Sequence, residues 1–176
     1  MEHFNVPQRR KAEFIKVPNT LKIKVGSGGL SEEILHKAQT LLEHNTVDFV
    51  PLADMYLDTL MRSIEQTRHM EDETEDIETH IASILYPTMQ LKANGGMFHY
   101  PLVTKISDRL IQFLEVLIEP DEQAIEIILA FYTTIRAIIH GRITGDGGEH
   151  GEALFDALNG ACYRYLEKYP KNVADI

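Results

Sequence analysis

The most regular apolar pattern in the sequence lies in residues 101–117, between two prolines. Apolar side chains recur there at every third or fourth position: Leu102, Val103, Ile106, Leu110, Phe113, Leu114 and Leu117. This spacing places them on one face of an α-helix. Pro101 fits the first turn of that helix, and Pro120 ends it. A chain built from such segments has to bury each apolar face against a neighbouring element.

The same periodicity recurs along the chain and predicts an all-α protein. Ser31 and Asp121 are suited to cap helix N-termini, because their side-chain oxygens can accept hydrogen bonds from free backbone N–H groups. Several amphipathic helices joined by short loops indicate a helical bundle. Besides the helix that begins near Tyr100, the sequence predicts helices after Ser31, over about 50–70, over about 76–94 with Gly95-Gly96 at its end, after Asp121, and over about 149–168.

Residues 1–28 form a predicted N-terminal arm, and residues 29–176 a single helical domain. Pro7 and Pro18 disfavour helix, and a glycine-rich break occupies residues 26–29. Residues 21–25 alternate apolar and basic side chains, which predicts an extended strand-like segment. The first 25 residues hold six basic and two acidic side chains, whereas the remainder holds 11 basic and 25 acidic ones. We expect the basic arm to fold back on the acidic body rather than to reach a phosphate or an acidic partner.

Composition also bounds the function. The formal charge of −10 argues against nucleic acid as a partner. No apolar run approaches the roughly 20 residues of a membrane span, and the first residues lack a secretion-signal pattern, so a cytoplasmic protein without membrane contact is expected. The single cysteine, Cys162, falls among apolar residues at helical spacing and is predicted to be buried and unreactive.

Patterns for catalysis or metal binding are weak. The glycine-rich loop 141–151 lacks the Gly-Lys-Ser/Thr of a phosphate-binding loop. His140, Glu149 and His150 lack the paired spacing of a metal site, so a turn between two helices is favoured there. The acidic stretch 71–76 lacks calcium-loop spacing and is expected to be a solvated turn. We therefore expect no enzymatic activity, no metal and no cofactor.

The most distinctive run is residues 89–96, Met-Gln-Leu-Lys-Ala-Asn-Gly-Gly. On a helix, positions separated by three and four residues share a face, so Met89, Lys92 and Ala93 lie together. The run resembles the core motif of histidine-phosphotransfer (HPt) domains of two-component signalling, in which a histidine is followed by x-Leu-Lys-Gly and small residues. In HPt domains these three positions carry the phosphoryl-accepting histidine, a lysine that offsets phosphate charge, and a glycine that leaves room for the partner.

The resemblance extends over most of the chain. Residues 95–104 are similar to a segment in a group of bacterial HPt-like proteins, where a Phe-Gly-Tyr-Pro-Leu-Val-Thr run is typical and where His99 here replaces the glycine. The loop 145–151 and the stretch 18–22 also resemble parts of that group. The resemblance implies an HPt-like helical bundle with an extended N-terminal arm.

Two residues depart from the HPt pattern. Met89 removes the phosphoryl acceptor, since a thioether cannot take the place of an imidazole in this chemistry. Pro87 falls inside the predicted helix two residues earlier and is expected to kink or break it. No histidine in the chain is followed three residues later by a basic side chain, and His80 would point away from Met89.

The resulting prediction is a non-catalytic HPt-like signalling protein that binds the receiver domain of a response regulator without relaying phosphate. A histidine kinase is a second candidate partner. Two alternatives stay open: an active phosphotransfer protein that uses His99, and a structural or assembly protein of bundle type. The predicted partner-binding residues are Met89, Gln90, Lys92, Ala93, Asn94, Gly96 and His99.

Overall fold

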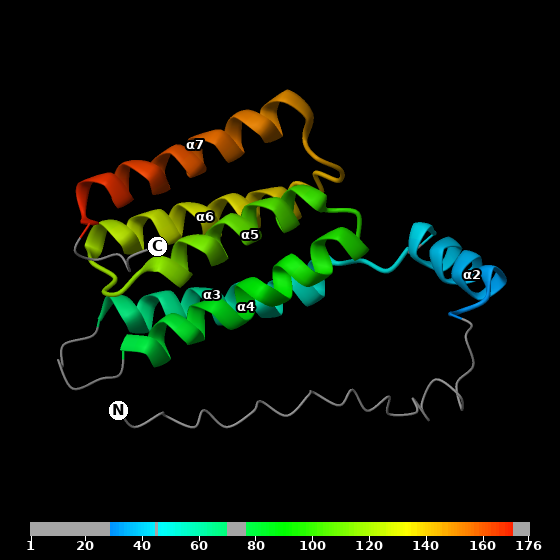
Figure 1. Cartoon of the computed structure of the whole chain (residues 1–176), viewed down its shortest axis with the longest axis horizontal. Coiled ribbons are helices and arrows are strands. Elements are labelled where there is room, and N and C mark those ends of the chain that lie inside the picture. The colour runs from blue at the N-terminus through cyan, green and yellow to red at the C-terminus, as the bar shows by residue number, and fades with distance from the viewer. Residues whose placement is uncertain (1–28, 45, 70–76, 171–176) are drawn as a thin grey trace, which may run out of the picture. The chain divides into compact units, whose positions relative to one another are not determined.

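A computed structural model describes residues 29–44, 46–69 and 77–170. These residues form six α-helices and no β-strand within the described ranges, which confirms the all-α class (Figure 1). The predicted arm, residues 1–28, and the acidic stretch 71–76 lie outside the described residues. The chain divides into two compact units, 1–43 and 44–176. The boundary predicted after residue 28 adjoins the undescribed part and stays a prediction.

The first unit contributes helix α2, Glu32–Glu43. The Ser31 hydroxyl accepts a hydrogen bond from the Ile34 backbone N–H at 3.3 Å, as the predicted cap requires. Lys37 forms an ion pair with Glu33 one turn earlier. Helical spacing places Ile34, Ala38, Leu41 and Leu42 in one apolar stripe, yet every residue of α2 is exposed.

The second unit contains helices α3 (Val50–Arg68), α4 (Ile77–Met97), α5 (Pro101–Val116), α6 (Glu122–His140) and α7 (Gly148–Lys168). Consecutive helices run in alternate directions, and α3, α4, α5 and α6 each contact the next around a four-helix ring (Figure 1). Helix α7 packs on α5 and α6. Short loops between consecutive helices favour this antiparallel arrangement of neighbours.

The core lies inside the ring and is almost entirely apolar. Phe113, Phe131 and Leu110 are fully buried at its centre. Helix α6 is long and apolar enough to cross a membrane by length and composition alone. Eight of its residues are buried, and α6 contacts α3, α5 and α7, so its apolar character is accounted for by the bundle core. Asp121 caps α6 as predicted, accepting a hydrogen bond from the Ala124 N–H at 2.8 Å.

Helical spacing predicts that Met55 and Leu154 lie on the apolar faces of the helices expected over about 50–70 and 149–168. Both predictions are wrong, since the two side chains are 65% and 39% exposed. Both lie at the margin of an apolar stripe, where spacing alone does not decide whether a neighbouring helix covers the residue. The predicted burial of Cys162 is confirmed, and desolvation raises the pKa of its thiol to about 11.

The hydroxyl of Ser107 on α5 is buried in the core, and no described residue forms a hydrogen bond with it. An unsatisfied buried polar group costs about 1–3 kcal/mol. We therefore expect Ser107→Ala to raise the free energy of unfolding by about 1 kcal/mol in urea titrations. Thr88→Ala is the contrasting variant, because the buried Thr88 hydroxyl donates to the Ile84 carbonyl at 2.8 Å, and its loss should destabilise the chain. A destabilised Ser107→Ala would contradict this reading.

Candidate functional site

The helix that carries the motif is continuous through Pro87. Helix α4 extends from Ile77 to Met97, so the predicted break does not occur, and Gly95-Gly96 lie inside the helix instead of ending it. Pro87 is buried against the bundle, where packing can offset the backbone hydrogen bond that proline cannot donate. The motif is therefore presented on uninterrupted helix.

One side of α4 faces the core and the other faces solvent. The buried residues are Ile84, Pro87, Thr88, Leu91 and Gly95. On the opposite side, the side chains of Tyr86, Met89 and Met97 are 62%, 49% and 46% exposed. Ala82 and Ala93 are exposed in the same row, since these five positions follow one another at spacings of three or four residues. We call this row, Ala82, Tyr86, Met89, Ala93 and Met97, the outer stripe.

All seven predicted partner-binding residues reach the surface. Met89, Ala93, Gly96 and His99 are exposed, whereas Gln90, Lys92 and Asn94 are half-buried on the flanks of α4. The Asn94 amide donates to the Gln90 carbonyl at 2.8 Å. The structure thus places Met89, Lys92 and Ala93 next to one another on one helix, as the spacing predicts, and gives Met89 the exposure that a contact residue needs.

Lys92 is engaged by a residue that the sequence analysis missed. Its ammonium nitrogen lies 2.5 Å from a carboxylate oxygen of Asp108 on α5, and both side chains are about two-fifths exposed. The Gln112 amide donates to the other Asp108 oxygen at 3.0 Å. Because the two charged residues are 16 positions apart on different helices, no helical spacing rule could pair them. By contrast, the periodicity of α4 could have revealed Tyr86 and Met97 as neighbours of Met89.

The end of the motif is held tightly against α5. The Tyr100 N–H donates to the Gly95 carbonyl at 2.7 Å, and the Thr104 hydroxyl donates to the Lys92 carbonyl at 3.0 Å. A Cβ atom on Gly95 would lie 2.7 Å from the Thr104 hydroxyl oxygen and 3.0 Å from the Tyr100 carbonyl oxygen. Only glycine therefore permits this close approach of α4 and α5.

Aromatic stacking fixes the turn after α4. The rings of Phe98 and Phe49 stack with centroids 4.8 Å apart, and Tyr100 packs on Phe49 at 5.7 Å. Phe49 precedes α3, and its side chain is 2% exposed. The segment after the motif is thus anchored to the start of the bundle's first helix.

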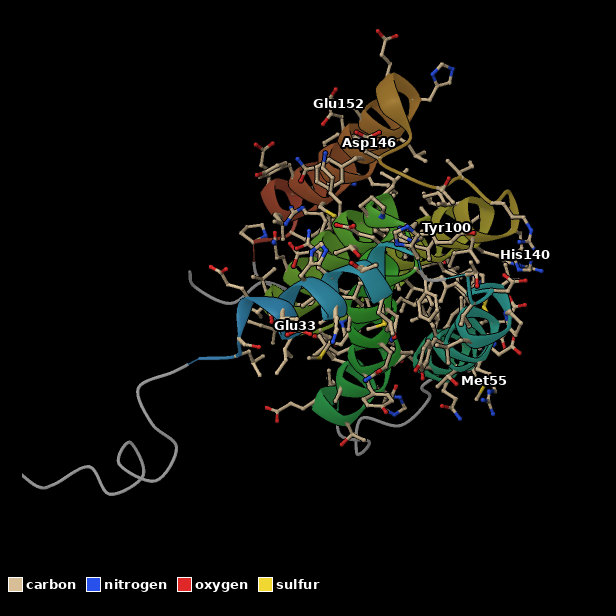
Figure 2. All side chains as sticks on the ribbon, turned by 90° about the vertical axis from the view of Figure 1, so that its right-hand side faces the viewer. Glu33, Met55, Tyr100, His140, Asp146 and Glu152 are labelled. Carbon is tan, nitrogen blue, oxygen red and sulfur yellow. The ribbon has the colours of Figure 1, made fainter. Side chains whose placement is uncertain are left out.

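The glycine-rich loop between α6 and α7 meets this turn at the same end of the bundle, where Tyr100 and Asp146 are labelled in Figure 2. The Gly145 N–H donates to the His99 carbonyl at 2.8 Å, and the Leu102 N–H donates to the Gly145 carbonyl at 3.4 Å. Gly151 packs so closely on the Asp146 carbonyl that a Cβ atom there would overlap it. Backbone hydrogen bonds therefore join two segments that are more than 40 residues apart in the sequence, 98–104 and 145–151, beside the motif.

His99 occupies the left-handed backbone region, with φ at 66°. Left-handed backbone costs an L-residue about 1–2 kcal/mol, part of which the greater flexibility of unfolded glycine offsets. We therefore expect His99→Gly to raise the free energy of unfolding by about 0.5–1 kcal/mol, measured by chemical denaturation. His69→Gly is the control, because His69 is also exposed and its φ is −100°. Equal effects of the two substitutions would contradict the backbone argument.

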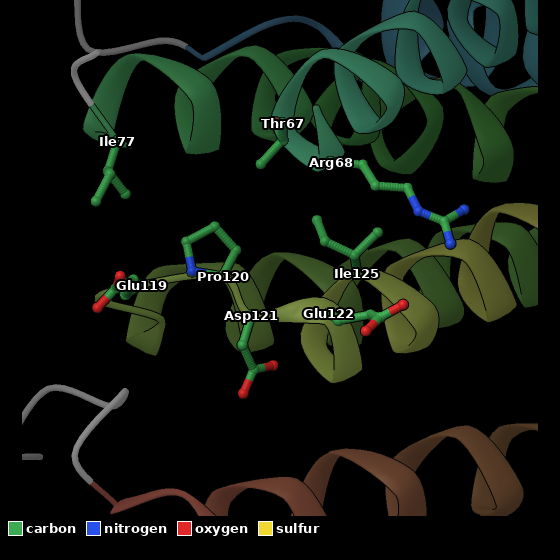
Figure 3. Close-up of a pocket in the computed structure, with 8 residues that line it drawn as sticks. All are labelled: Thr67, Arg68, Ile77, Glu119, Pro120, Asp121, Glu122 and Ile125. Carbon is green, nitrogen blue, oxygen red and sulfur yellow. The ribbon is translucent and has the colours of Figure 1, made fainter. Parts of the chain in front are cut away.

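Two other candidate sites are a metal site near His140 and a hollow at the other end of the bundle. Among the described residues, no group of three or more His, Cys, Asp or Glu side chains is placed to hold a metal ion. His140 instead lies 2.9 Å from Asp54 of α3. A hollow of about 380 Å³ opens at the opposite end of the bundle, lined by Thr67, Arg68 and Glu122 among others (Figure 3). It includes none of the predicted site residues.

The sequence matches no protein-family model, and no curated protein or solved structure shows a significant match to the chain.

Proposed function

We propose that this chain is a non-catalytic HPt-like signalling protein that binds a receiver domain of a response regulator in the cytoplasm without relaying phosphate. The observation that carries the proposal is the exposed outer stripe beside Lys92 on α4. Exposed apolar side chains gathered in one row mark interaction surfaces more often than isolated ones do. The motif predicts a docking face on this helix, and the outer stripe runs through it.

The chemistry of the stripe suits docking rather than catalysis. Met89 and Met97 have unbranched thioether side chains that adapt to a partner surface. Ala82 and Ala93 leave room for close approach of another chain. Without a phosphoryl acceptor at position 89, the chain would act by occupancy, either sequestering a regulator or competing with an active phosphotransfer protein.

The surroundings of the motif lend further support. Two of the segments that resemble the bacterial HPt-like group, 95–104 and 145–151, meet at the end of α4 through backbone hydrogen bonds. A likeness spread over two distant parts of the sequence is more telling when these parts assemble beside the same helix. An HPt-like bundle would use this end to position the motif helix.

Binding to receiver domains from the same cell tests the proposal, with calorimetry as the readout. We expect a complex that forms without any phosphate and that weakens at least tenfold in Met89→Glu, since an unpaired charge would be desolvated in the interface. Met55→Glu is the matched control, because Met55 is an exposed methionine on α3 and does not belong to the outer stripe. Failure of every receiver domain to bind the wild-type chain would exclude the proposal.

The exposed apolar residues of α2 favour a second candidate, an assembly protein that binds through this helix. Leu41 is 74% exposed and Ile34 is 52% exposed. This reading predicts that Leu41→Glu abolishes partner binding in pull-downs while Met89→Glu leaves it intact. The receiver-binding proposal predicts the opposite result, in which Met89→Glu weakens partner binding and Leu41→Glu leaves it intact.

A further inference from the structure

The single lysine of the motif helix is part of an ion pair, and this pair presents no net positive charge to a partner. Within α4, Ile77–Met97, Lys92 is the only Lys or Arg residue. Its charge is offset by Asp108 at 2.5 Å, and Gln112 holds the second oxygen of that carboxylate. The Thr104 hydroxyl also fixes the Lys92 backbone carbonyl. The cation that an HPt-like site would present to a phosphoryl group is thus already paired.

The two basic residues of α5 on either side of Asp108 are directed to α7 instead. The Lys105 ammonium lies 4.1 Å from the ring centroid of Phe155. The Arg109 guanidinium donates to Asn159 at 2.6 Å and lies over the ring of Tyr163, and it also donates to the Gln112 side-chain carbonyl of α5 at 3.3 Å. Neither side chain replaces Lys92 as a cation free for a ligand at Met89.

We propose that the outer stripe of α4 selects the unphosphorylated form of its receiver partner and releases that partner when its aspartate becomes phosphorylated. This inference rests on the proposed function. A phosphoryl group adds negative charge at the site on the receiver that meets position 89. A lone lysine would attract this charge, whereas the Lys92–Asp108 pair is neutral and leaves the repulsion by the acidic body of the chain uncompensated.

The preference for the unphosphorylated receiver persists although the Lys92–Asp108 pair is half-exposed. A half-exposed ion pair contributes little to stability, so Lys92 can turn from Asp108 toward a phosphate. Asp108 would then lie close to the phosphate without a counter-ion of its own, so its repulsion would offset the attraction by Lys92. The excess of acidic residues over the body of the chain acts in the same direction. One additional charge interaction at a partly screened surface corresponds to roughly a tenfold change in affinity.

The test compares the affinity of the full chain for a bound receiver domain with and without beryllofluoride, which mimics the aspartyl phosphate. We expect binding to be roughly tenfold weaker with beryllofluoride. In Asp108→Asn, which removes the carboxylate and leaves Lys92 charged, the ratio between the two affinities should fall to about twofold or less. Raising the ionic strength should also reduce the ratio in the wild type.

Asp58→Asn provides the control, because it removes one acidic charge from an exposed position of α3 without contact to Lys92. It should keep the tenfold ratio. Equal or tighter binding of the beryllofluoride form would overturn the inference and leave the proposed function intact. A ratio unchanged in Asp108→Asn would overturn the charge mechanism, and absence of binding in both states would overturn the proposed function together with the inference.

Discussion

Gly95→Ala is expected to lower the free energy of unfolding by roughly 1–3 kcal/mol, although alanine is the better helix former. The added Cβ would lie 2.7 Å from the Thr104 hydroxyl and 3.1 Å from the Thr104 backbone nitrogen. Overpacking of this kind costs about 1–3 kcal/mol. Displacing Thr104 also weakens its hydrogen bond to the Lys92 carbonyl, worth about 1 kcal/mol. The helix-propensity gain of about 1 kcal/mol offsets only part of this loss.

The neighbouring residue supplies the control for this prediction. Gly96 is exposed, and a Cβ atom there would meet only the Thr104 hydroxyl, at an ordinary 3.7 Å. Gly96→Ala should therefore raise stability by about 0.5–1 kcal/mol, as a glycine replaced inside a helix does. Urea unfolding of the two single variants measures the difference directly. Equal stabilities would mean that α4 and α5 are not in the close contact described.

This pair of glycines shows what the sequence could and could not predict. Six helices were predictable because apolar spacing, prolines and caps such as Asp121 act locally. The end of α4 was placed three residues too early, since two consecutive glycines usually terminate a helix. Here the helix continues because the contact of Gly95 with α5 requires a residue without a side chain, and this tertiary requirement leaves no local signature.

The features of the candidate site were likewise predictable only in part from the sequence. The proximity of Met89 to Lys92 and Ala93 followed from helical geometry alone, whereas the exposure of Met89 is given by the structure. The Lys92–Asp108 pair did not, since it depends on the register between two helices. Pro87 was expected to disrupt the site, but its burial in the bundle keeps the helix continuous. The pairing of the charge on Lys92 is thus a property of the packing.

Met89→His is expected to make the chain a phosphoryl acceptor. Position 89 is half-exposed on a continuous helix, with Lys92 three residues later, so an imidazole there would occupy the place that the HPt motif gives to its acceptor. The chain would be incubated with radiolabelled phosphorylated receiver domains and their kinase, and acid-labile label would be counted on the chain. We expect label on Met89→His and none on the wild type. Label on the wild type that disappears in His99→Ala would instead favour phosphotransfer through His99.

Met55→His controls for mere exposure of an added histidine, because position 55 is solvent-exposed on α3 but has no motif around it. It should stay unlabelled. Adding Asp108→Asn to Met89→His should increase the label, since Lys92 would then be free to stabilise the phosphorylated imidazole. An unlabelled Met89→His variant that still binds receivers would show that the face docks regulators in an orientation unsuited to transfer. If it neither binds nor is labelled, the likeness to HPt domains is one of bundle shape only, and the exposed residues of α2 become the place to look for the interaction.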